Sequence, residues 1–420
     1  MSAKLQPVRG THDILPEESR KRLHIADTWR RIAETYGYGE IQTPMFEMSD
    51  VFHRTLGDTS DVVTKETYTF TDRGGESLTL RPEFTASVVR AFISESLTQD
   101  LPQKFFYHGP AFRYERPQKG RLRQFHQVGV ELLGAAEPEA DVEMIVLAAQ
   151  GLKTLGLEKR TRLEINTLGD AESRKKYRQA LVEYFTKHQN GLSEDSKIRL
   201  EKNPLRILDS KDPQDKKLVE FAPAMQNFLT TDALQFFTTV NEGLYKLGIK
   251  ATPNLRLVRG LDYYNHTVFE FVADDGLGSQ NTVLAGGRYD GLVAQMGGPE
   301  VPGVGWAAGV ERMLALMDEA AFPAKSKCIS VIVVSDVAES AAWELTQSLR
   351  EAGIIVDMPY SGNIGKRLKR ANKIGASFAV MLGEDEMKTN SVALKNLATG
   401  EQKTIAQAQL INQLKNNHVL

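Results

Sequence analysis

Cysteine is almost absent from this 420-residue chain, because Cys328 is the only one. A single cysteine excludes an internal disulfide and a zinc site built from cysteine ligands, and it is typical of proteins in a reducing compartment. Long apolar runs are missing too, since no stretch of about 18 apolar residues could span a bilayer. No apolar segment near Met1 resembles a secretory signal. We therefore expect a cytoplasmic protein without a membrane partner.

An excess of either charge is also missing. Lys and Arg total 52 against 54 Asp and Glu, which gives a formal net charge of −2. Proteins that coat nucleic acid without regard to its sequence need a large excess of cations. Any RNA partner must therefore bind to local basic faces. The phosphate-binding pattern Gly-x-x-x-x-Gly-Lys does not occur in the chain either.

The chain is long enough for two or three domains, and its 41% hydrophobic and 25% charged residues are typical of a folded globular protein. Apolar residues recur at helical spacing from Pro16 to Tyr36, where Gly37 ends the predicted helix. From Gly39 to about residue 133, short β-rich runs alternate with charged loops. This pattern predicts an antiparallel sheet with helices on one face.

A polar, helical stretch follows Asn166 and continues to about Leu247, and none of its residues suggests chemistry, so we interpret it as an insertion. Strand-like runs return at residues 268–272 and 282–285, so the insertion divides one sheet into two pieces of sequence. After Cys328, strands alternate with helices, which predicts a small α/β domain with a partly parallel sheet. The predicted parts are residues 1–168, 169–252, 253–322 and 327–420.

Three segments carry residues suited to nucleotide chemistry, although each also has an ordinary structural interpretation. Residues 37–44 form a helix end, a turn and a short strand. Residues 112–115, Phe-Arg-Tyr-Glu, precede a loop rich in cations, where an arginine fork can bind two phosphate oxygens but a solvated surface is equally possible. Residues 303–312 lead from small residues to a Glu-Arg pair; small residues allow either a close ligand or tight helix–sheet packing.

In this order the three segments resemble the signature motifs of class II aminoacyl-tRNA synthetases, and the His-x-Gly-His motif of class I is absent. Residues 257–265, Leu-Val-Arg-Gly-Leu-Asp-Tyr-Tyr-Asn, and residues 285–292, Ala-Gly-Gly-Arg-Tyr-Asp-Gly-Leu, are similar to the two histidine-specific motifs of histidyl-tRNA synthetases. The resemblance covers almost the whole chain. Its C-terminal part is similar to the anticodon-binding domain of that subclass.

Two positions depart from the family pattern. Class II enzymes usually carry an acid four residues after the motif 2 phenylalanine, here Phe125, but this chain has Gly129, and the nearest acid is Glu131. Many bacterial members have a small residue where this chain has Phe84. The second departure affects the predicted shape of the amino-acid pocket more than its chemistry.

The resemblance implies a mixed α/β chain with an α+β catalytic core. That core would contain the class II antiparallel sheet flanked by helices, a helical insertion would interrupt it, and an α/β anticodon-binding domain would follow. The implied activity joins L-histidine to ATP as histidyl-adenylate, releases pyrophosphate, and transfers histidine to the 3′ end of tRNA(His). Mg²⁺ is expected to accompany ATP, although its protein ligands are unknown, and motif 1 implies a homodimer.

The resemblance also assigns roles to single residues. Arg113 and Arg259 would contact the α-phosphate from two sides as the catalytic residues. A neutral imidazole has one N–H donor and one acceptor, and the family offers Glu131 and Tyr264 for them. The other implied ligands are Glu83, Thr85 and Gln127 for the ammonium group of histidine, Tyr263 for the pocket wall, Glu115 and Phe125 for adenine, and Arg121 and Arg312 for the distal phosphates.

Basic side chains in two regions are the expected tRNA contacts. In the motif 2 loop they would reach the acceptor end, and in the C-terminal part they crowd one predicted helix. A solvated basic helix is the alternative for the second group. The residues are Arg116, Gln118, Lys119 and Arg123 in the loop, and Lys366, Arg367, Lys369 and Arg370 on the helix.

Other functions share part of this pattern. A synthetase-like regulatory subunit of ATP phosphoribosyltransferase usually lacks the arginine motif and the anticodon-binding domain, whereas this chain has Arg259 and a C-terminal part after Cys328. A tRNA-sensing domain of a regulatory kinase would be accompanied by kinase sequence, which is not present. A synthetase for threonine, proline or glycine should not carry Arg-Gly-Leu-Asp-Tyr-Tyr at residues 259–264.

Overall fold

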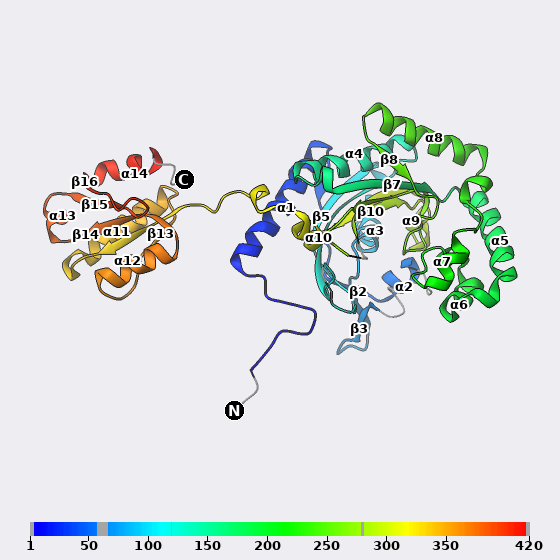
Figure 1. The fold of residues 1–420 in the computed structure, drawn as a ribbon, viewed down its shortest axis with the longest axis horizontal. Helices are drawn as coiled ribbons and strands as arrows, with labels where there is room; N and C mark the ends of the chain where they lie inside the picture. The colour runs from blue at the N-terminus through cyan, green and yellow to red at the C-terminus, as the bar shows by residue number, and fades with distance from the viewer. Residues whose placement is uncertain (1–3, 57–65, 119, 279–280, 417–420) are drawn as a thin grey trace. The chain divides into compact units, whose positions relative to one another are not determined.

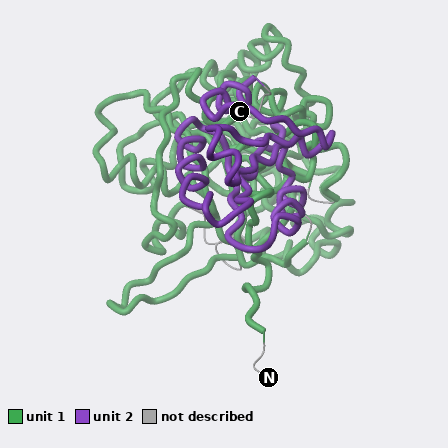
Figure 2. The backbone as a smooth tube through the Cα atoms, turned by 90° about the vertical axis from the view of Figure 1, so that its left-hand side faces the viewer, with its two compact units in different colours: residues 1–322 green, residues 323–420 purple. Residues whose placement is uncertain are grey.

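The computed structural model describes residues 4–56, 66–118, 120–278 and 281–416 (Figure 1). They form two compact units, Met1–Phe322 and Pro323–Leu420, which are green and purple in Figure 2. Within the described ranges, no helix has the length and apolar character needed to cross a membrane. Each unit is described separately below.

An eight-stranded sheet forms the centre of the first unit. Its inner strands all pair antiparallel, and only the two short edge strands pair parallel with their neighbours. This confirms the antiparallel sheet that the β-rich runs predict. In spatial order the strands are β1 (Gly39–Glu40), β5 (Gln103–Phe112), β6 (Gln124–Leu133), β11 (Gly303–Gly309), β10 (Thr282–Arg288), β9 (Asn265–Ala273), β7 (Thr161–Thr167) and β8 (Ala251–Pro253).

The three strands that follow the predicted insertion lie together in this sheet, between β6 and β7, which precede it. β11 pairs with β6, which places Trp306 opposite Val130, and β9 pairs with β7, which places Phe269 opposite Ile165. The hydrophobic core on the face of these residues is continuous. The two distant pieces of sequence therefore form one sheet, as the returning strand-like runs predict.

Helices α1 (Pro16–Thr35), α4 (Pro138–Thr154) and α10 (Val310–Leu316) pack into this core. The ring centroids of Trp29 on α1 and Trp306 on β11 lie 4.9 Å apart. A Cβ atom on Gly151 of α4 would lie 1.9 Å from the Trp29 ring. The close approach of α1 and α4 therefore requires glycine at this position.

The opposite face of the sheet has a second core. Leu132 and Phe269 belong to the first core, whereas their neighbours Leu133 and Val268 belong to the second, because successive strand residues point to opposite faces. Phe92 contributes to this second core from a covering helix. The elements on this side are α2 (Asp50–Leu56), α3 (Thr85–Ser94), α9 (Leu292–Gln295) and a small sheet with the order β2 (Phe46–Met48), β4 (Ser77–Leu80), β3 (Tyr68–Thr71).

The polar stretch after Asn166 is helical in the structure, as its composition predicts. Tyr177, Leu181 and Phe185 belong to a small core of its own, while Val240 joins the first core beside α4. The boundaries 169 and 252 remain a prediction. The helices are α5 (Ala171–Lys187), α6 (Glu194–Lys202), α7 (Pro213–Val219) and α8 (Thr231–Lys246).

The second unit contains a five-stranded sheet with helices. β12 pairs parallel with β13 and β14, whereas β14, β15 and β16 pair antiparallel, so the partly parallel sheet predicted after Cys328 is confirmed. The strand order is β13 (Val356–Asp357), β12 (Cys328–Val333), β14 (Ala376–Leu382), β15 (Ser391–Asn396) and β16 (Gln402–Ala406); the helices are α11 (Glu339–Glu351), α12 (Ile364–Lys373), α13 (Glu384–Lys388) and α14 (Gln407–Asn416).

A fully buried ion pair joins residues from the two sides of the predicted insertion. Arg288 ends β10, after the insertion, and forms an ion pair with Asp141 on α4, before the insertion. The same guanidinium donates hydrogen bonds to the backbone carbonyls of Ala135 (2.9 Å) and Glu137 (3.2 Å) and to the carboxylate of Asp290 (3.0 Å). This network satisfies a charge that would otherwise be costly to bury.

Removing one partner of this pair should destabilise the first unit strongly. In Asp141→Ala the buried guanidinium of Arg288 loses its counter-ion, and we expect the free energy of unfolding to fall by about 3–5 kcal/mol. Urea unfolding followed by tryptophan fluorescence measures the change. Asp274→Ala removes an exposed partner of Arg162 and should cost less than about 1 kcal/mol. Equal stabilities of the two variants would contradict this role for the buried pair.

Candidate active site

A cavity of about 280 Å³ opens in the first unit. Its lining comes from five separated stretches: the start of α3 with the loop before it, the hairpin between β5 and β6, residues 259–264, Glu270 on β9, and the β10, β11 and α10 region. Every predicted ligand of ATP and histidine except Glu131 lines it. These residues are Glu83, Thr85, Arg113, Glu115, Arg121, Phe125, Gln127, Arg259, Tyr263, Tyr264 and Arg312.

The hairpin between β5 and β6 contributes two of the arginines. Arg113 Nε donates to the carbonyl of Pro82 at 2.9 Å, and its guanidinium carbon lies 5.2 Å from the centre of the Phe125 ring. Arg121 Nε forms an ion pair with the buried carboxylate of Glu115 at 2.7 Å, and Arg113 Nη1 is 4.0 Å from the same carboxylate. One anion is therefore shared between two cations.

Arg312, in the first turn of α10, adds a third cation to this side of the cavity. Burial, together with the charges of Arg121 and Arg113, lowers the pKa of its guanidinium. Its Nη1 donates to the carbonyl of Thr282. A concentration of like charge in a partly buried cavity is unfavourable until an anion binds, so the arrangement favours a ligand with several negative charges.

Arg259 lies within the first histidine-specific segment. It forms an ion pair with Glu270 on β9, and its guanidinium carbon is 5.7 Å from the ring of Tyr264. Burial opposes its charge, but Glu270 and the phenols of Tyr264 and Tyr263 keep the pKa of Arg259 above its ordinary value. The guanidinium therefore remains cationic in the cavity.

Two polar atoms at the cavity have no hydrogen-bond partner. They are the buried acceptor Oε1 of Gln127 and the buried donor Nε of Arg259. Buried polar atoms are normally paired, so each favours a complementary ligand group. An amino acid carries both groups needed, an ammonium donor and a carboxylate acceptor.

The start of α3 presents an acid and a hydroxyl to the same cavity. Both carboxylate oxygens of Glu83 accept backbone N–H groups, from Thr85 at 2.6 Å and from Ala86 at 2.9 Å. Burial raises the pKa of Glu83 despite these bonds. Thr85 in turn donates its hydroxyl to Glu131 at 2.7 Å. Glu83 thus stabilises the helix start as well as facing the cavity.

Glu131 lies one layer behind the cavity wall. Its carboxyl group is fully buried and accepts hydrogen bonds from the hydroxyls of Thr85, Tyr107 (3.1 Å) and Tyr289. Burial raises the pKa of Glu131 to about 8, so this carboxyl group is protonated at neutral pH. Thr85 is the member of this network that lines the cavity.

The two positions that depart from the family pattern both adjoin the ring of Tyr107. A Cβ atom on Gly129 would lie 2.3 Å from the Tyr107 hydroxyl, so an acid cannot fit there without moving that ring. Phe84 stacks on the other side of Tyr107, with ring centroids 4.5 Å apart, and the guanidinium carbon of Arg81 lies 3.8 Å from the Phe84 ring. Phe84 is buried and does not line the cavity.

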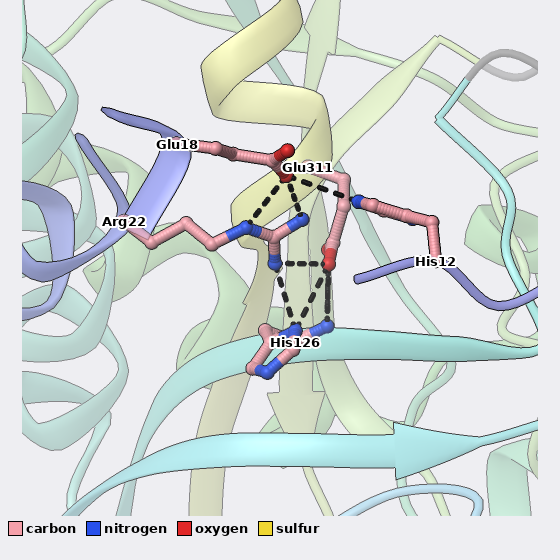
Figure 3. Close-up of polar contacts among 5 residues, drawn as sticks. All are labelled: His12, Glu18, Arg22, His126 and Glu311. Carbon is pink, nitrogen blue, oxygen red and sulfur yellow. Dashed lines mark hydrogen bonds and ion pairs between the residues drawn. The ribbon is translucent and has the colours of Figure 1, made fainter. Parts of the chain in front are cut away.

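Five polar side chains anchor the start of α10 (Figure 3). Glu311 accepts hydrogen bonds from Arg22 at 2.6 Å and from the backbone N–H of His126 at 3.0 Å. Arg22 also pairs with Glu18, which contacts His12 at 3.2 Å. These contacts lower the pKa of Glu311 although burial opposes them. Arg312 follows Glu311 and lines the cavity, so it projects from a helix start that these contacts hold in place.

Comparisons with known proteins agree with this geometry. A family model described as "Histidyl-tRNA synthetase" matches residues 10–313, and one described as "Anticodon binding domain" matches residues 329–417. The chain belongs to the histidyl-tRNA synthetase family. A "Histidine--tRNA ligase" of Rhodospirillum rubrum is 57% identical over 97% of the chain and 98% of that protein. A relative of the same name from Gluconacetobacter diazotrophicus is 55% identical over 96% and 97% of the two chains.

Solved structures give the same result for the fold. Apo histidyl-tRNA synthetase of S. aureus superposes with a TM-score of 0.83 at 35% identity, over 98% of this chain and all of that one. A protein of Bacillus halodurans, described as an "ATP phosphoribosyltransferase regulatory subunit/histidyl-tRNA synthetase", has a TM-score of 0.66 at 22% identity, over 91% and 99% of the two chains. The second likeness supports the fold alone. Both fit the synthetase fold, with its helix-flanked antiparallel sheet and its α/β anticodon-binding domain.

The tRNA contacts predicted in the motif 2 loop of this synthetase fold have different surroundings. Arg116 and Gln118 are exposed. Arg123 is held in place, because its guanidinium carbon lies 4.0 Å from the Tyr114 ring and its Nε donates to a backbone carbonyl. Lys119 lies outside the described residues. Two of the predicted contacts are thus fully available to a partner.

The predicted contacts on α12 of the anticodon-binding domain also divide into two kinds. Lys366 and Lys369 are exposed. Arg367 donates to the carbonyl of Val333 at 2.7 Å, and Arg370 forms an ion pair with Asp357 at 2.8 Å. The two arginines therefore help to attach α12 to the sheet, whereas the lysines extend into solvent.

The described part of the synthetase chain contains no group of three His, Cys, Asp or Glu side chains placed to hold a metal ion. Three of the carboxylates at the cavity are paired with cations, Glu115 with Arg121, Glu270 with Arg259 and Glu311 with Arg22. The fourth, Glu83, accepts two backbone N–H groups. These residues do not form an all-protein metal cage. Mg²⁺ is commonly bound through one or two carboxylates and the phosphates of a nucleotide, so the site is compatible only with that second mode.

Three residues of the site were not predicted from the sequence. Glu270 pairs with Arg259, and Tyr107 and Tyr289 donate to Glu131. Glu270 had a detectable signal, because it is an acid inside the otherwise apolar run of residues 268–272. Tyr289 also had a signal, because it lies inside the histidine-specific segment 285–292. Tyr107 had none, since a buried tyrosine in a strand usually belongs to a core.

The protonated state of Glu131 predicts a pH dependence of stability. Its pKa is about 8 in the folded chain and near 4.5 when unfolded. The folded state therefore binds an extra proton between these values, and wild-type stability falls as pH rises through this window. Glu131→Gln preserves the neutral form at every pH. We expect the unfolding free energy of Glu131→Gln, relative to wild type, to increase by about 1–4 kcal/mol from pH 5 to pH 8. Above pH 8 this difference should remain level.

Urea unfolding at several pH values, followed by tryptophan fluorescence, measures this difference. Glu143→Gln is the matched control, because that carboxylate is partly exposed and paired with Lys104. Parallel pH profiles of wild type and Glu131→Gln would show that Glu131 ionises normally.

Proposed function

We propose that this chain activates L-histidine with ATP and then esterifies the 3′ end of tRNA(His). In the first step a carboxylate oxygen of histidine attacks the α-phosphorus of ATP, the bond to the bridging oxygen breaks, and pyrophosphate leaves. In the second step a hydroxyl of the terminal ribose attacks the histidyl carbonyl and AMP leaves. Membership of the family and the lining of the cavity support this activity.

The cluster of arginines carries the proposal for the first step. Phosphoryl transfer depends mainly on positioning and on cationic stabilisation of phosphoryl oxygens. Arg113 and Arg259 are assigned to the α-phosphate, and Arg121 and Arg312 to the β- and γ-phosphates. Burial and the charges of Arg121 and Arg113 lower the pKa of Arg312, which supports this assignment because a triphosphate would offset the repulsion among these cations.

Adenine recognition is assigned to Phe125 and Glu115. Phe125 lines the cavity and has an arginine near its ring, as expected of a surface on which a base can stack. Glu115 is buried and paired with Arg121. Its carboxylate can accept a further hydrogen bond from an exocyclic amino group.

Histidine recognition is assigned to two sets of groups. The unpaired Oε1 of Gln127, with Glu83 and Thr85, suits the ammonium group. Tyr264 and the network around Glu131 are assigned to the imidazole, and Tyr263 to the pocket wall. A site built to satisfy both ring nitrogens rejects side chains that leave its polar groups unpaired, by on the order of 10⁴-fold in favourable cases.

Mg²⁺ belongs to the proposed reaction as a companion of ATP. Bound to the phosphates, it would neutralise part of their negative charge. The carboxylates of Glu115 and Glu270 are paired with arginines, and that of Glu83 accepts two backbone N–H groups, so a protein ligand would have to give up one of these contacts. Phosphate oxygens and water are therefore proposed as its main ligands.

The tRNA contacts and the assembly state complete the proposal. Arg116, Gln118, Lys119 and Arg123 are assigned to the acceptor end, and Lys366, Arg367, Lys369 and Arg370 to the anticodon stem. We also propose a homodimer in the cytoplasm. Four half-exposed apolar side chains on and beside the small sheet support such an interface, because monomers rarely leave large apolar patches in water. They are Met45, Phe46, Met48 and Phe70.

Amino-acid-dependent exchange of pyrophosphate into ATP tests the activation step. With all twenty amino acids screened, we expect exchange with histidine alone. Arg259→Ala should reduce the rate by about 10²- to 10³-fold, because it removes a cation that stabilises the transition state. Arg162→Ala, at an exposed ion pair outside the cavity, is the matched control and should retain wild-type exchange.

Two results would contradict the proposal. Exchange with another amino acid would overturn the assigned specificity. No exchange with any amino acid, from folded protein, would favour a regulatory subunit of the kind named in the description of the Bacillus halodurans protein.

A further inference from the structure

The segment that carries Arg259 runs between the insertion and the cavity. Arg256 donates hydrogen bonds to three backbone carbonyls of the insertion, at residues 220, 222 and 223, with distances of 2.8–3.1 Å. Val258 packs against the hydrophobic core of the insertion. Arg259 and Leu261, in contrast, line the cavity. One short segment is thus attached to the insertion on one side and forms part of the active site on the other.

Asp262 makes the strongest of these attachments. Its Oδ1 accepts hydrogen bonds from Arg206 Nε and Asn203 Nδ2, both at 2.9 Å, and the first is an ion pair. Its backbone carbonyl accepts from Arg174 Nη2 at 3.3 Å. Arg174 lies on α5, whereas Asn203 and Arg206 lie between α6 and α7. Two separate parts of the insertion therefore converge on one residue.

Asp262 does not line the cavity, so a direct contact with ATP or histidine is not indicated. It lies three residues after Arg259. At the other end of the segment, Asn166 Nδ2 donates to the carbonyl of Leu257 at 2.9 Å. The backbone that carries Arg259 is therefore held on its N-terminal side by both the sheet and the insertion, and on its C-terminal side by the insertion through Asp262.

We propose that Asp262 is a positioning residue for the activation step, and that the insertion acts on this step through it. The contacts of Asp262 with Arg206 and Asn203 set the backbone from which Arg259 reaches the α-phosphate. Loss of these contacts lets Arg259 move while the cavity remains able to bind its substrates. This inference rests on the proposed function, because it concerns the rate of adenylate formation.

Kinetics of pyrophosphate exchange test the inference. In Asp262→Ala we expect kcat per active site to fall by about 10- to 100-fold, because small displacements of a catalytic group are costly. The KM values for ATP and histidine should stay within about threefold of wild type, since ground-state contacts are kept. Arg206→Gln, which changes the residue of the insertion that pairs with Asp262, should also lower kcat.

The conservative variant and the double mutant separate positioning from folding. Asp262→Asn keeps an acceptor oxygen and should recover kcat to within about fivefold of wild type. Adding Arg206→Gln to Asp262→Ala should lower kcat by no more than about a further twofold, because both substitutions remove the same contact. Active-site titration supplies the concentration of active enzyme, so a loss of folded protein alone does not lower kcat. Asp232→Ala, an exposed acid on α8, is the control.

Several outcomes would overturn the inference. Wild-type kcat in Asp262→Ala, a loss confined to KM, or additive losses in the double mutant would each exclude a positioning role. If Asp262→Ala does not fold, Arg206→Gln and Asp262→Asn decide the question alone. If the wild type shows no exchange, the proposed function is contradicted. If the wild type shows exchange and Asp262→Ala exchanges at the same rate, only this inference is contradicted.

Discussion

The buried guanidinium of Arg288 makes the contacts on which assembly of the catalytic sheet depends. The sheet combines strands from two distant stretches of sequence, and Arg288 joins them by pairing with Asp141 and with carbonyls that precede the insertion. A strand register that separated these groups would leave a charge buried without a partner. In the observed sheet β11 lies between β6 and β10. This strand order brings Gln127 and Arg312 to the same cavity.

In the cavity, repulsion among the arginines is opposed by their pairing with carboxylates. Burial and the neighbouring arginines lower the pKa of Arg312, whereas Glu115 pairs with Arg121 and lies near Arg113, and Glu270 pairs with Arg259. These pairs keep the side chains ordered before a ligand arrives. They do not cancel the positive charge of the cluster, so the empty site is less stable than a site that contains a polyanion.

The sequence predicted the features that depend on local pattern, and it missed the side-chain contacts that depend on the register of neighbouring strands. The β-rich runs predicted up to about residue 133 include β6, and the basic helix predicted in the C-terminal part is α12. The motifs also named the residues that the fold brings together around the cavity. The hydroxyl of Tyr107 on Glu131 follows from the register of β5 on β6, which periodicity does not encode. For the same reason, the shape of Tyr107 explains Gly129, whereas a motif comparison registers only a missing acid.

The order of strands in the sheet has a consequence for synthesis on the ribosome. β6 ends at residue 133, but its neighbour β11 begins only at residue 303. At elongation rates of about 5–20 residues per second, the inner edge of the β5–β6 hairpin therefore waits on the order of 10–30 seconds for its partner. An unpaired strand edge can bind other chains during that interval. The helical residues between them emerge during the same interval and have a core of their own, so the nascent chain can bury part of its apolar surface before the sheet is complete.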